Sequence, residues 1–468
     1  MDITSKMLAT IWTALGGNES DTSQVGFATA GALSSVFPVT DLAASSMAAA
    51  GLAVEMLRRA VGCQAAPVTV DRRLASFWFA TSLRPLGWQI PPSWDPVAGN
   101  YATRDGWIRL HTNAPHHRAA AERVLGHQTD RAGMAASVAR WDKLELETAI
   151  VQAGGCAAQM RSAEEWLLHP QGQAVASEPL AHMRTHTASA SARNGLHAAP
   201  SAFDPARPLA GLKVLDLTRV LAGPTATRFL AAYGAQVLRI DPPTWDEPGI
   251  VPEMTLGKRC ARLDLRKPQD RAVFERLLAG ADIMLHGYRS DALERLGYGA
   301  DWRRARNPGL IDVSLDAYGW SGPWATRRGF DSLVQMSSGL AHAGMLWQRT
   351  DKPFPLPVQA LDYAAGYLMA AAAVRGVTMR LEGAGALQAR TSLARTAKLL
   401  LDLGTDTAQE PAFAPESASD IADGIELTVW GEAHRIAWPI ALPDCHAEWA
   451  HPANALGWAP AQWEAEAR

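Results

Sequence analysis

The sequence predicts an α/β protein with a Rossmann-like open parallel sheet and a second, smaller α+β domain. Between residues 200 and 400, short apolar segments alternate with helical ones, as in parallel strands joined by crossover helices. Before them, NYATRDGWIRLHTN has the pattern of a hairpin and is followed by helices. We therefore expect five parts: a helical segment (1–82), a small α+β domain (83–184), a linker (185–208), the sheet domain (209–395) and a tail packing with either domain (396–468).

The elements of the sheet domain follow from local signals. KVLDL (Lys213–Leu217) is a short apolar strand, and Gly223-Pro224 opens a helix with proline at its first position, where a missing N–H costs nothing. That helix ends at Gly234, a natural C-terminal cap. QVLRI is the second strand. Further on, DRAVFERLLAG is a predicted helix, and ADIMLHGY and GLIDVSLDAYG contain predicted strands. In the tail, IELTVWGEAHRIAWPIAL predicts an antiparallel pair.

The composition is ordinary for a globular enzyme, with 48% hydrophobic and 19% charged residues. A net charge of −3 argues against a nucleic-acid partner. MDITSKMLATIW lacks the basic start and apolar run of a signal peptide, and the Ala-rich LAASSMAAAGLAVEML is a predicted buried helix and not a membrane span. The four cysteines form no CxxC, which favours a reducing cytoplasm without disulfides or a zinc site.

The histidines do not indicate a metal site either. The 13 histidines form no HExxH motif. His116 and His117, in APHHRAAAE, are adjacent and would not share a helix face. We expect them to be solvated surface residues.

The turn from Val220 to Pro224 is the predicted ligand site. It follows the first strand, and ligands of open α/β sheets bind at the carboxyl ends of strands. The helix that begins there offers free N–H groups and the positive end of its dipole, which suit a phosphate. Asp241 ends the second strand, where a ribose-binding acid would lie. The turn holds one glycine instead of the three of GxGxxG, which disfavours NAD.

An internal repeat links the two ends of the chain. FPVTDLAASSMAAAGLAVEMLRR (37–59) parallels LPVQALDYAAGYLMAAAAVRGVTMR (356–380), with Asp41 matching Asp362 and Arg59 matching Arg380. Both are followed by β-like segments, VTVDRRLAS and LQARTSLAR. We favour a true duplication over chance likeness of two Ala-rich helices.

At this point the sequence resembles a known family. LAGLKVLDLTRVLAGPTATRFLAAYGAQVLRIDPP resembles the opening of the family III CoA-transferases (CaiB/BaiF type), which include formyl-CoA transferase, carnitine CoA-transferase and α-methylacyl-CoA racemase. The resemblance continues in the same order through three later motifs of the family, over about residues 208–395. These motifs are GKRCARLDLRKP, ADIMLHGYRSDALERLGY and NPGLIDVSLDAYGWSGPWATRRGFDSLVQMSSG. YATRDGWIRL and GGCAAQMRSAEEWLLHP resemble the family's small domain, which normally comes later. HPANALGW resembles its closing segment. The domain order is therefore rearranged.

The resemblance implies a cytoplasmic enzyme that moves coenzyme A between an acyl-CoA and a small carboxylic acid through an aspartyl intermediate. It also implies no metal, nucleic-acid or membrane partner, and an intertwined homodimer. Carried over by motif, the residues implied to bind coenzyme A are Arg219, Val220, Leu221, Ala222, Leu263, Arg266, Gly287, Tyr288 and Arg295.

Two aspartates compete for the catalytic role that the resemblance implies. Asp351, in GMLWQRTDKPFPLP, falls where the transferases place their nucleophile. Asp331, in RRGFDSLVQ, matches the acid/base position of the racemases. The plainer interpretations are a loop-surface acid for Asp351 and a helix N-cap for Asp331.

Three other functions stay open. An acyl-CoA racemase would move the α-proton, but it pairs aspartate with histidine and none lies between Tyr288 and Phe330. A degenerate CoA-binding protein without activity is the third hypothesis, since the family's glycine-rich flap has no clear copy between Trp78 and Tyr101. An NAD-dependent enzyme is a distant fourth.

Overall fold

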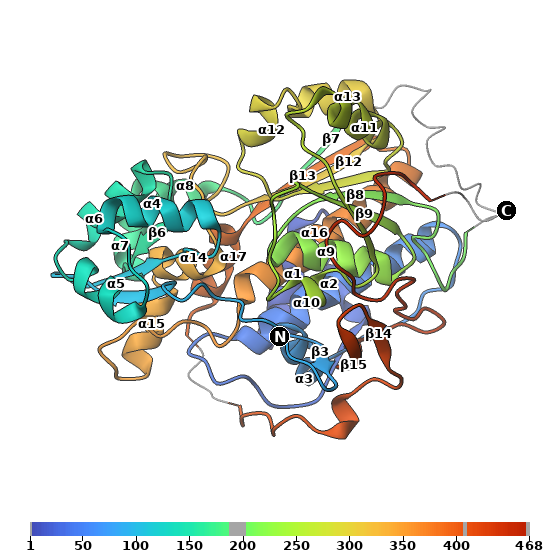
Figure 1. Ribbon diagram of the computed structural model, residues 1–468. Helices are drawn as coiled ribbons and strands as arrows, with labels where there is room; N and C mark the ends of the chain where they lie inside the picture. The colour runs from blue at the N-terminus through green and yellow to red at the C-terminus, as the bar shows by residue number, and fades with distance from the viewer. Residues whose placement is uncertain (1, 187–202, 406–409, 465–468) are drawn as a thin grey trace.

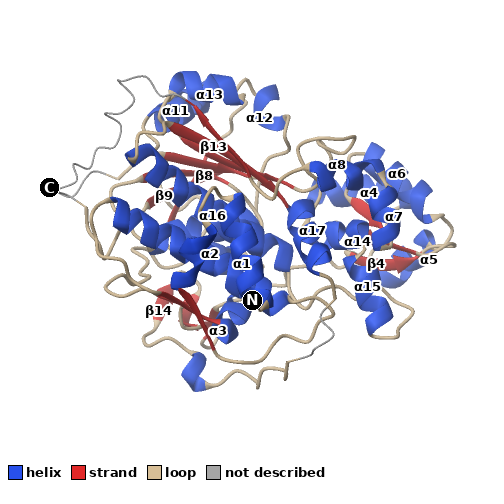
Figure 2. Cartoon of the chain, turned by 180° about the vertical axis from the view of Figure 1, so that it is seen from behind, coloured by secondary structure: helices blue, strands red, loops and turns tan. Residues whose placement is uncertain are grey.

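The computed structural model describes residues 2–186, 203–405 and 410–464. The larger lobe is built on a seven-stranded sheet, and a smaller lobe lies beside it (Figures 1 and 2). Most of the predicted linker, residues 187–202, lies outside the described residues. The division of the chain into five domains stays a prediction.

The large sheet has the strand order of doubly wound folds. In space its strands are β10 (Lys258–Arg262), β9 (Gln236–Asp241), β8 (Lys213–Leu217), β11 (Ile283–His286), β12 (Ile311–Asp316), β13 (Ala386–Ser392) and β7 (His182–His186). The first six are parallel, and in chain order they follow the pattern 3-2-1-4-5-6. The predicted α/β class with a parallel sheet is confirmed.

Helices cover both faces of this sheet (Figures 1 and 2). Its inner strands are buried almost throughout, because apolar side chains face the core on both sides. One face carries α11 (Pro268–Ala279), α12 (Ala292–Arg295) and α13 (Ala300–Arg306). The other carries α9 (Ala222–Ala232) and α16 (Ala360–Leu381), with α2 (Val39–Ala60) and α1 (Ile3–Ala14) beyond them.

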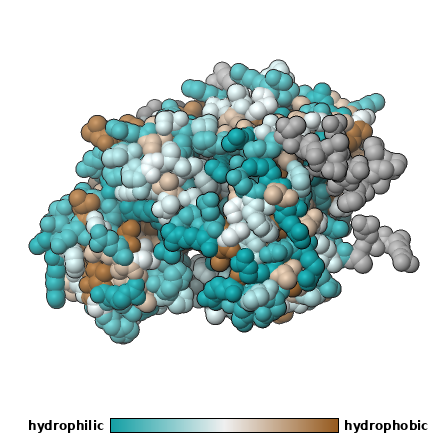
Figure 3. Space-filling view, turned by 90° about the horizontal axis from the view of Figure 1, so that it is seen from above, coloured by the Kyte–Doolittle hydropathy of each residue, from teal (hydrophilic) through white to brown (hydrophobic). Residues whose placement is uncertain are grey.

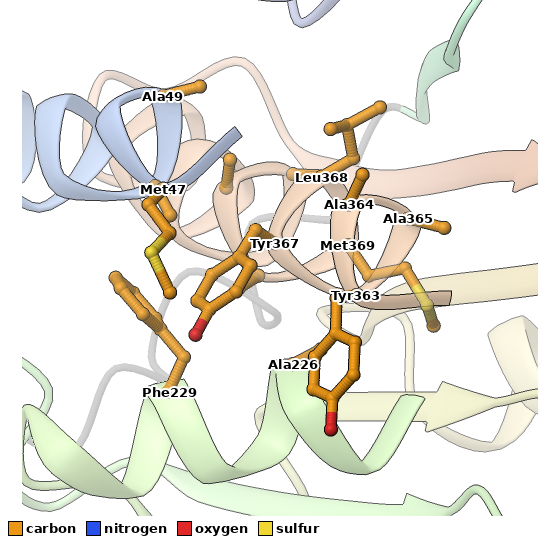
Figure 4. Close-up of a cluster of buried hydrophobic side chains, with 14 of the residues drawn as sticks. Met47, Ala49, Ala226, Phe229, Tyr363, Ala364, Ala365, Tyr367, Leu368 and Met369 are labelled. Atoms are coloured by element: carbon orange, nitrogen blue, oxygen red, sulfur yellow. The ribbon is translucent and has the colours of Figure 1, made fainter. Parts of the chain in front are cut away.

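The centre of the core is a helix pair formed by α2 and α16. Each has 22 residues, rich in alanine, and nearly all of them are buried. Small side chains let two helices approach closely. In Figure 4, Met47 of α2 and Tyr367 of α16 point toward Phe229 of α9, so three helices distant in sequence share one cluster.

The structure extends the predicted repeat. β1 (Val25–Ala28), α2, β2 (Val68–Asp71) and α3 (Arg72–Trp78) come in the same order as β12, α16, β13 and α17 (Leu393–Leu403), although residues 331–347 add two helices between β12 and α16. β1 is parallel to β2 as β12 is to β13, and β16 (Ile440–Ala441) completes the smaller sheet. The first 82 residues are therefore not only helical. They form a strand-helix-strand-helix unit that packs against its later counterpart.

The smaller lobe has an antiparallel sheet of three strands. These are β4 (Gly99–Ala102), β5 (Trp107–Leu110) and β6 (Ala157–Gln159), so the hairpin prediction is confirmed. Its helices are α4 (Pro115–Leu125), α5 (Arg131–Val138), α6 (Lys143–Gln152), α7 (Ala163–Leu168) and α8 (Pro170–Ser177). From later in the chain, α14 (Asp331–Ser338) and α15 (Leu340–Trp347) also pack on this lobe.

The C-terminal tail runs over the larger lobe. Its predicted antiparallel pair is confirmed as β14 (Glu426–Thr428) and β15 (Gly431–Arg435), and β3 (Leu83–Pro85) extends the pair to three strands. The remaining short helices are η1 (Glu19–Gln24), α10 (Val251–Met254) and η4 (Ala418–Asp420). No helix of the described chain is both long and apolar enough to cross a membrane. The surface in Figure 3 is mainly hydrophilic, with small scattered apolar patches.

Candidate active site

A cavity of about 330 Å³ opens at the carboxyl ends of β8 and β11. These two strands flank the point where the strand order reverses, which is the ligand-binding position of doubly wound sheets. The wall comes from the turn after β8, the loop after β11, the segment before α14, and the starts of α4 and α16. Its polar lining residues are His116, His117, Thr218, Arg219, Tyr288, Arg289, Asp316, Arg327, Arg328 and Asp362.

The turn after β8 has an unusual backbone. Val220 has a φ of 65°, in the left-handed region that β-branched residues avoid, a feature often found at functional sites. Its N–H donates to the Glu247 carboxylate over 3.1 Å. Gly223 is required by packing, since a Cβ there would lie 2.2 Å from Cβ of Thr218. The sequence therefore forces the start of α9 close to the strand.

A buried polar pair supports this turn from below. The Asp216 carboxylate accepts the Thr218 N–H over 2.8 Å. Lys258 Nζ lies 3.4 Å from the same carboxylate and donates to the Pro224 carbonyl over 2.8 Å. Burial lowers the pKa of Lys258 to about 8. The pair fixes the first turn of α9 relative to β8.

Arginines give the cavity an affinity for anions. The Arg219 guanidinium lies between two rings, 4.7 Å from the Trp245 centroid and 4.9 Å from that of Tyr288, and donates to the Tyr288 hydroxyl. These contacts hold the guanidinium in the wall of the cavity. Arg289 and two further arginines, Arg327 and Arg328, line the same cavity. Guanidinium groups bind phosphates through paired charge-assisted hydrogen bonds.

Two buried aspartates meet at the start of α16. Asp331, the first residue of α14, accepts the N–H groups of Leu361 (2.8 Å) and Asp362 (3.1 Å) and a hydrogen bond from Gln335. Asp362 lines the cavity, and among the described residues no hydrogen bond to its carboxylate is present. Asp331 therefore holds the backbone while Asp362 keeps a free carboxylate toward the ligand.

The burial of both carboxylates changes their titration. Burial raises the pKa of Asp331 to about 6, although its hydrogen bonds oppose this shift. Burial and then the charge of Asp331 raise the pKa of Asp362 well above its ordinary value. Two close carboxylates cannot both ionise easily, so the pair retains a proton that either group alone would lose.

The structure brings together five of the residues predicted to bind coenzyme A: Arg219, Val220, Ala222, Gly287 and Tyr288 line the cavity. Leu221 packs against the large core instead.

Three further predicted residues lie outside the cavity. Leu263 is buried in the core on the opposite face of the sheet. Arg266 and Arg295 are exposed and form ion pairs with Asp264 and Asp291. Because these residues follow β10 and β11, which run parallel, they lie at the same edge of the sheet as the cavity.

Neither of the two aspartates favoured as catalytic residues lines the cavity. Asp351 is exposed in the loop between α15 and α16. Asp331 is fully buried behind Asp362. The geometry favours Asp362, which the sequence had marked only as the repeat partner of Asp41.

The prediction that His116 and His117 are solvated surface residues is wrong for His117. His117 is 4% exposed, its ring nitrogens have no partner among the described residues, and both histidines line the cavity. Packing of α4 against Phe330, 5.8 Å from the His117 ring centroid, buries it. The described residues contain no group of three histidine, cysteine or acidic side chains able to hold a metal.

Comparison with known proteins gives the family. The sequence profile of CoA-transferase family III matches residues 209–418, the part that carries the six parallel strands of the large sheet and Asp362. This part of the chain belongs to family III of the CoA-transferases. An acetyl-coenzyme A transferase of Hypoxylon pulicicidum is 34% identical, over 42% of this chain and 33% of its own length. A probable fatty acyl-CoA transferase of Mycobacterium tuberculosis is 35% identical, over 38% of this chain and 48% of its own.

The family III likeness reaches beyond the matched segment. An acyl-CoA transferase of Gibberella moniliformis is 27% identical over 72% of this chain and 61% of its own. The chain thus spans about a third to three fifths of these curated relatives. Among solved structures, the alignment with an M. tuberculosis protein covers 42% of this chain and 59% of that protein's chain, at 29% sequence identity and a TM-score of 0.38.

Proposed function

We propose that the protein is a CoA-transferase that moves coenzyme A from an acyl-CoA to a carboxylic acid, with Asp362 as the reacting carboxylate. The observation that carries the proposal is the cavity itself, which combines four arginines with the buried carboxylate of Asp362, to which no described residue donates a hydrogen bond. The match to CoA-transferase family III and the similarity to acetyl-CoA and fatty acyl-CoA transferases support it.

Coenzyme A would lie along the carboxyl edge of the sheet. Its phosphates suit Arg219 and Arg289, and its thioester end would enter beside Asp362. From β10 to β11 the edge spans three strand spacings, about 14 Å, which an extended nucleotide can cover. Contacts from Leu263, Arg266 and Arg295 to the adenosine end remain predictions consistent with this path.

The reaction begins when the Asp362 carboxylate attacks the thioester carbonyl. The C–S bond breaks, the thiolate leaves, and an acyl-aspartyl anhydride forms. The thiolate then attacks the aspartyl carbonyl, which releases the first acid and gives an aspartyl-CoA thioester. The acceptor carboxylate attacks that thioester, and the returning thiolate takes the new acyl group. Each step exchanges one acyl bond, so no redox partner is needed.

The surroundings of Asp362 favour this chemistry. A carboxylate without hydrogen-bond donors is poorly solvated and therefore a better nucleophile. The first turn of α9, at Ala222 and Gly223, lines the same cavity, and first-turn N–H groups of a helix have no partner within it. These amides are placed to stabilise the oxyanion that develops on the carbonyl.

Trapping of the intermediate tests the proposal. We expect acyl-CoA to leave an adduct on Asp362 that hydroxylamine captures and peptide mass spectrometry locates. Asp362→Asn should remove the adduct and lower turnover by several orders of magnitude, while CoA affinity by calorimetry stays within a few-fold.

Asp351→Asn is the matched control, because that carboxylate is exposed outside the cavity. It should leave both turnover and adduct unchanged. An adduct on Asp351, or full activity of Asp362→Asn, contradicts the proposal. CoA binding without transfer from any acyl-CoA would support the degenerate, non-enzymatic alternative.

One observation favours a second candidate, transfer of the substrate's α-proton. His117 lines the same cavity as Asp362, so an aspartate and a histidine face one ligand site, and burial lowers the pKa of His117 to about 3, which keeps its imidazole neutral. Incubation of a chiral acyl-CoA in heavy water would show deuterium at the α-carbon, with loss of exchange in His117→Ala and no trapped adduct.

A further inference from the structure

A second cavity, of about 230 Å³, adjoins the first. The two share Val220, Trp245 and Phe330 as lining residues. The second cavity lies between residues 246–250 of the larger lobe and residues 92–95, which lead into the smaller lobe. Residues 92–95 fall in the stretch where the sequence has no glycine-rich flap.

The wall formed by residues 92–95 is fastened to both lobes. Ser93 Oγ donates to the Gly249 carbonyl over 3.0 Å, and a Cβ on Gly249 would lie 2.6 Å from Cα of Ser93. Asn113 Nδ2 donates to the Ser93 carbonyl over 2.8 Å, and its Oδ1 accepts the Asp95 N–H over 3.1 Å. The cavity therefore has fixed walls where the two lobes meet.

Aromatic rings form much of the lining. The His111 ring stacks on Phe330 with centroids 3.7 Å apart, and Trp94 meets His111 edge-on at 5.7 Å. Trp245 and Ile250 also line the cavity. Such a slot suits an apolar or flat group.

The charged lining residues are all acidic. Asp95, Asp246 and Glu247 contribute carboxylates, and no Lys or Arg is among the described residues that line this cavity. Asp95 is already paired with Arg118, and Glu247 with Arg239. The Arg109 guanidinium packs on the Trp94 ring but does not line the cavity. Asp246 has no ion-pair partner among the described residues, so a ligand carboxylate here would meet a like charge and no cationic lining residue, which is costly.

We propose that this second cavity takes the acyl group of the thioester and selects an uncharged acyl chain over one that ends in a second carboxylate. The proposal rests on the proposed function, since it assumes that the thioester lies beside Asp362. The two cavities then bind chemically different parts of the same substrate. The phosphates of coenzyme A face arginines, and the acyl chain faces aromatic rings and carboxylates.

Butyryl-CoA and succinyl-CoA form a matched pair, because both carry four-carbon acyl chains that end in a methyl group and a carboxylate respectively. Calorimetry on Asp362→Asn compares their binding with that of free CoA without turnover. We expect butyryl-CoA to bind roughly tenfold more tightly than CoA, as burial of a few apolar carbons predicts. Succinyl-CoA should bind no more tightly than CoA.

Equal affinities for all three ligands, or tighter binding of succinyl-CoA than of butyryl-CoA, would overturn the proposal. If CoA itself fails to bind, the proposed function fails first, so the two failures are distinguishable.

Two variants locate the effect. Trp94→Ala should remove most of the butyryl-CoA advantage and leave CoA binding unchanged. Trp458→Ala is its control, since Trp458 is 40% exposed against 41% for Trp94 but lies outside both cavities.

Asp246→Lys should raise succinyl-CoA affinity several-fold with little change for butyryl-CoA. A rise of equal size for both ligands would show that the new charge acts on the phosphates, against the proposal.

Discussion

The carboxylates of Asp331 and Asp362 have different partners although they are adjacent. Asp331 accepts three hydrogen bonds, two of them from the backbone at the start of α16, whereas Asp362 accepts none from the described residues. Asp331 is therefore a positioning residue, and its charge also disfavours ionisation of Asp362.

This coupling predicts a pH effect. The attacking carboxylate must be ionised, so kcat/KM should rise with pH as the pair loses its proton. Asp331→Asn removes the neighbouring negative charge and lowers the pKa of Asp362, so the rise should move to lower pH. A pH-rate profile of both enzymes checks this. We expect a loss of maximal rate below about tenfold, since asparagine still offers an acceptor oxygen to the two N–H groups.

If kcat/KM of Asp331→Asn rises over the same pH range as that of the unchanged enzyme and only its maximum is lower, then Asp331 affects the reaction only by holding the structure.

The first copy of the repeat shows how surroundings decide the role of a residue. Asp41 occupies the position of Asp362, but it accepts hydrogen bonds from Thr4 and from Arg72 (3.0 Å), and Arg72 also pairs with Glu410. The adjoining cavity measures only about 90 Å³. Asp41 is thus held by protein groups through its Oδ1.

At the scale of elements, one glycine sets the distance between α16 and α9. A Cβ on Gly366 would lie 2.4 Å from the Ala222 carbonyl oxygen and 2.8 Å from Cβ of Thr225. Gly366 follows Asp362 by one helical turn, so it shares a face with the carboxylate. The close approach of the two helices therefore brings Asp362 to the cavity.

Gly366→Ala should push the helices apart. We expect the free energy of unfolding in urea to fall by about 1–3 kcal/mol, as is typical of overpacking, and CoA affinity to weaken.

Gly376→Ala, on the same helix, is the control. The three atoms nearest to its Cβ would belong to the side chains of Ile311 and Leu387 and not to the backbone, so they can shift more easily. It should leave CoA affinity unchanged. Equal weakening by both substitutions would show that general loss of stability, and not the helix spacing, affects the site.

Most elements could be predicted because their signals are local. Apolar runs marked β8, β9, β11 and β12, and Gly-Pro marked the start of α9. β7 was not predicted, since HMRTH lacks an apolar period and becomes a strand only by pairing with β13 at the sheet edge. The contacts of Asp331 with residues 361 and 362 join positions that are 30 and 31 residues apart, which local sequence signals do not reveal.

At the scale of the whole molecule, α1 and α2 are part of the main core, since α2 covers α16. A chain without them would expose a long apolar face of α16. We expect that variant to lose cooperative unfolding in urea and to aggregate, as followed by circular dichroism and light scattering. Adding residues 1–60 as a separate peptide should restore solubility. A truncated chain that stays folded and soluble would contradict this view of the core.

The pairing of α2 with α16 also bears on how the chain folds during synthesis. About 300 residues separate the end of α2 from the start of α16, which at 5–20 residues per second corresponds to roughly 15–60 s on the ribosome. Throughout that delay the face of α2 that packs against α16 lacks this partner, although α1 precedes it and α3 follows it closely in the chain. The nascent chain therefore needs a chaperone or a temporary contact until α16 emerges. During refolding from denaturant both helices are present from the start. A smaller fraction of the protein should therefore aggregate during refolding than during rapid overexpression.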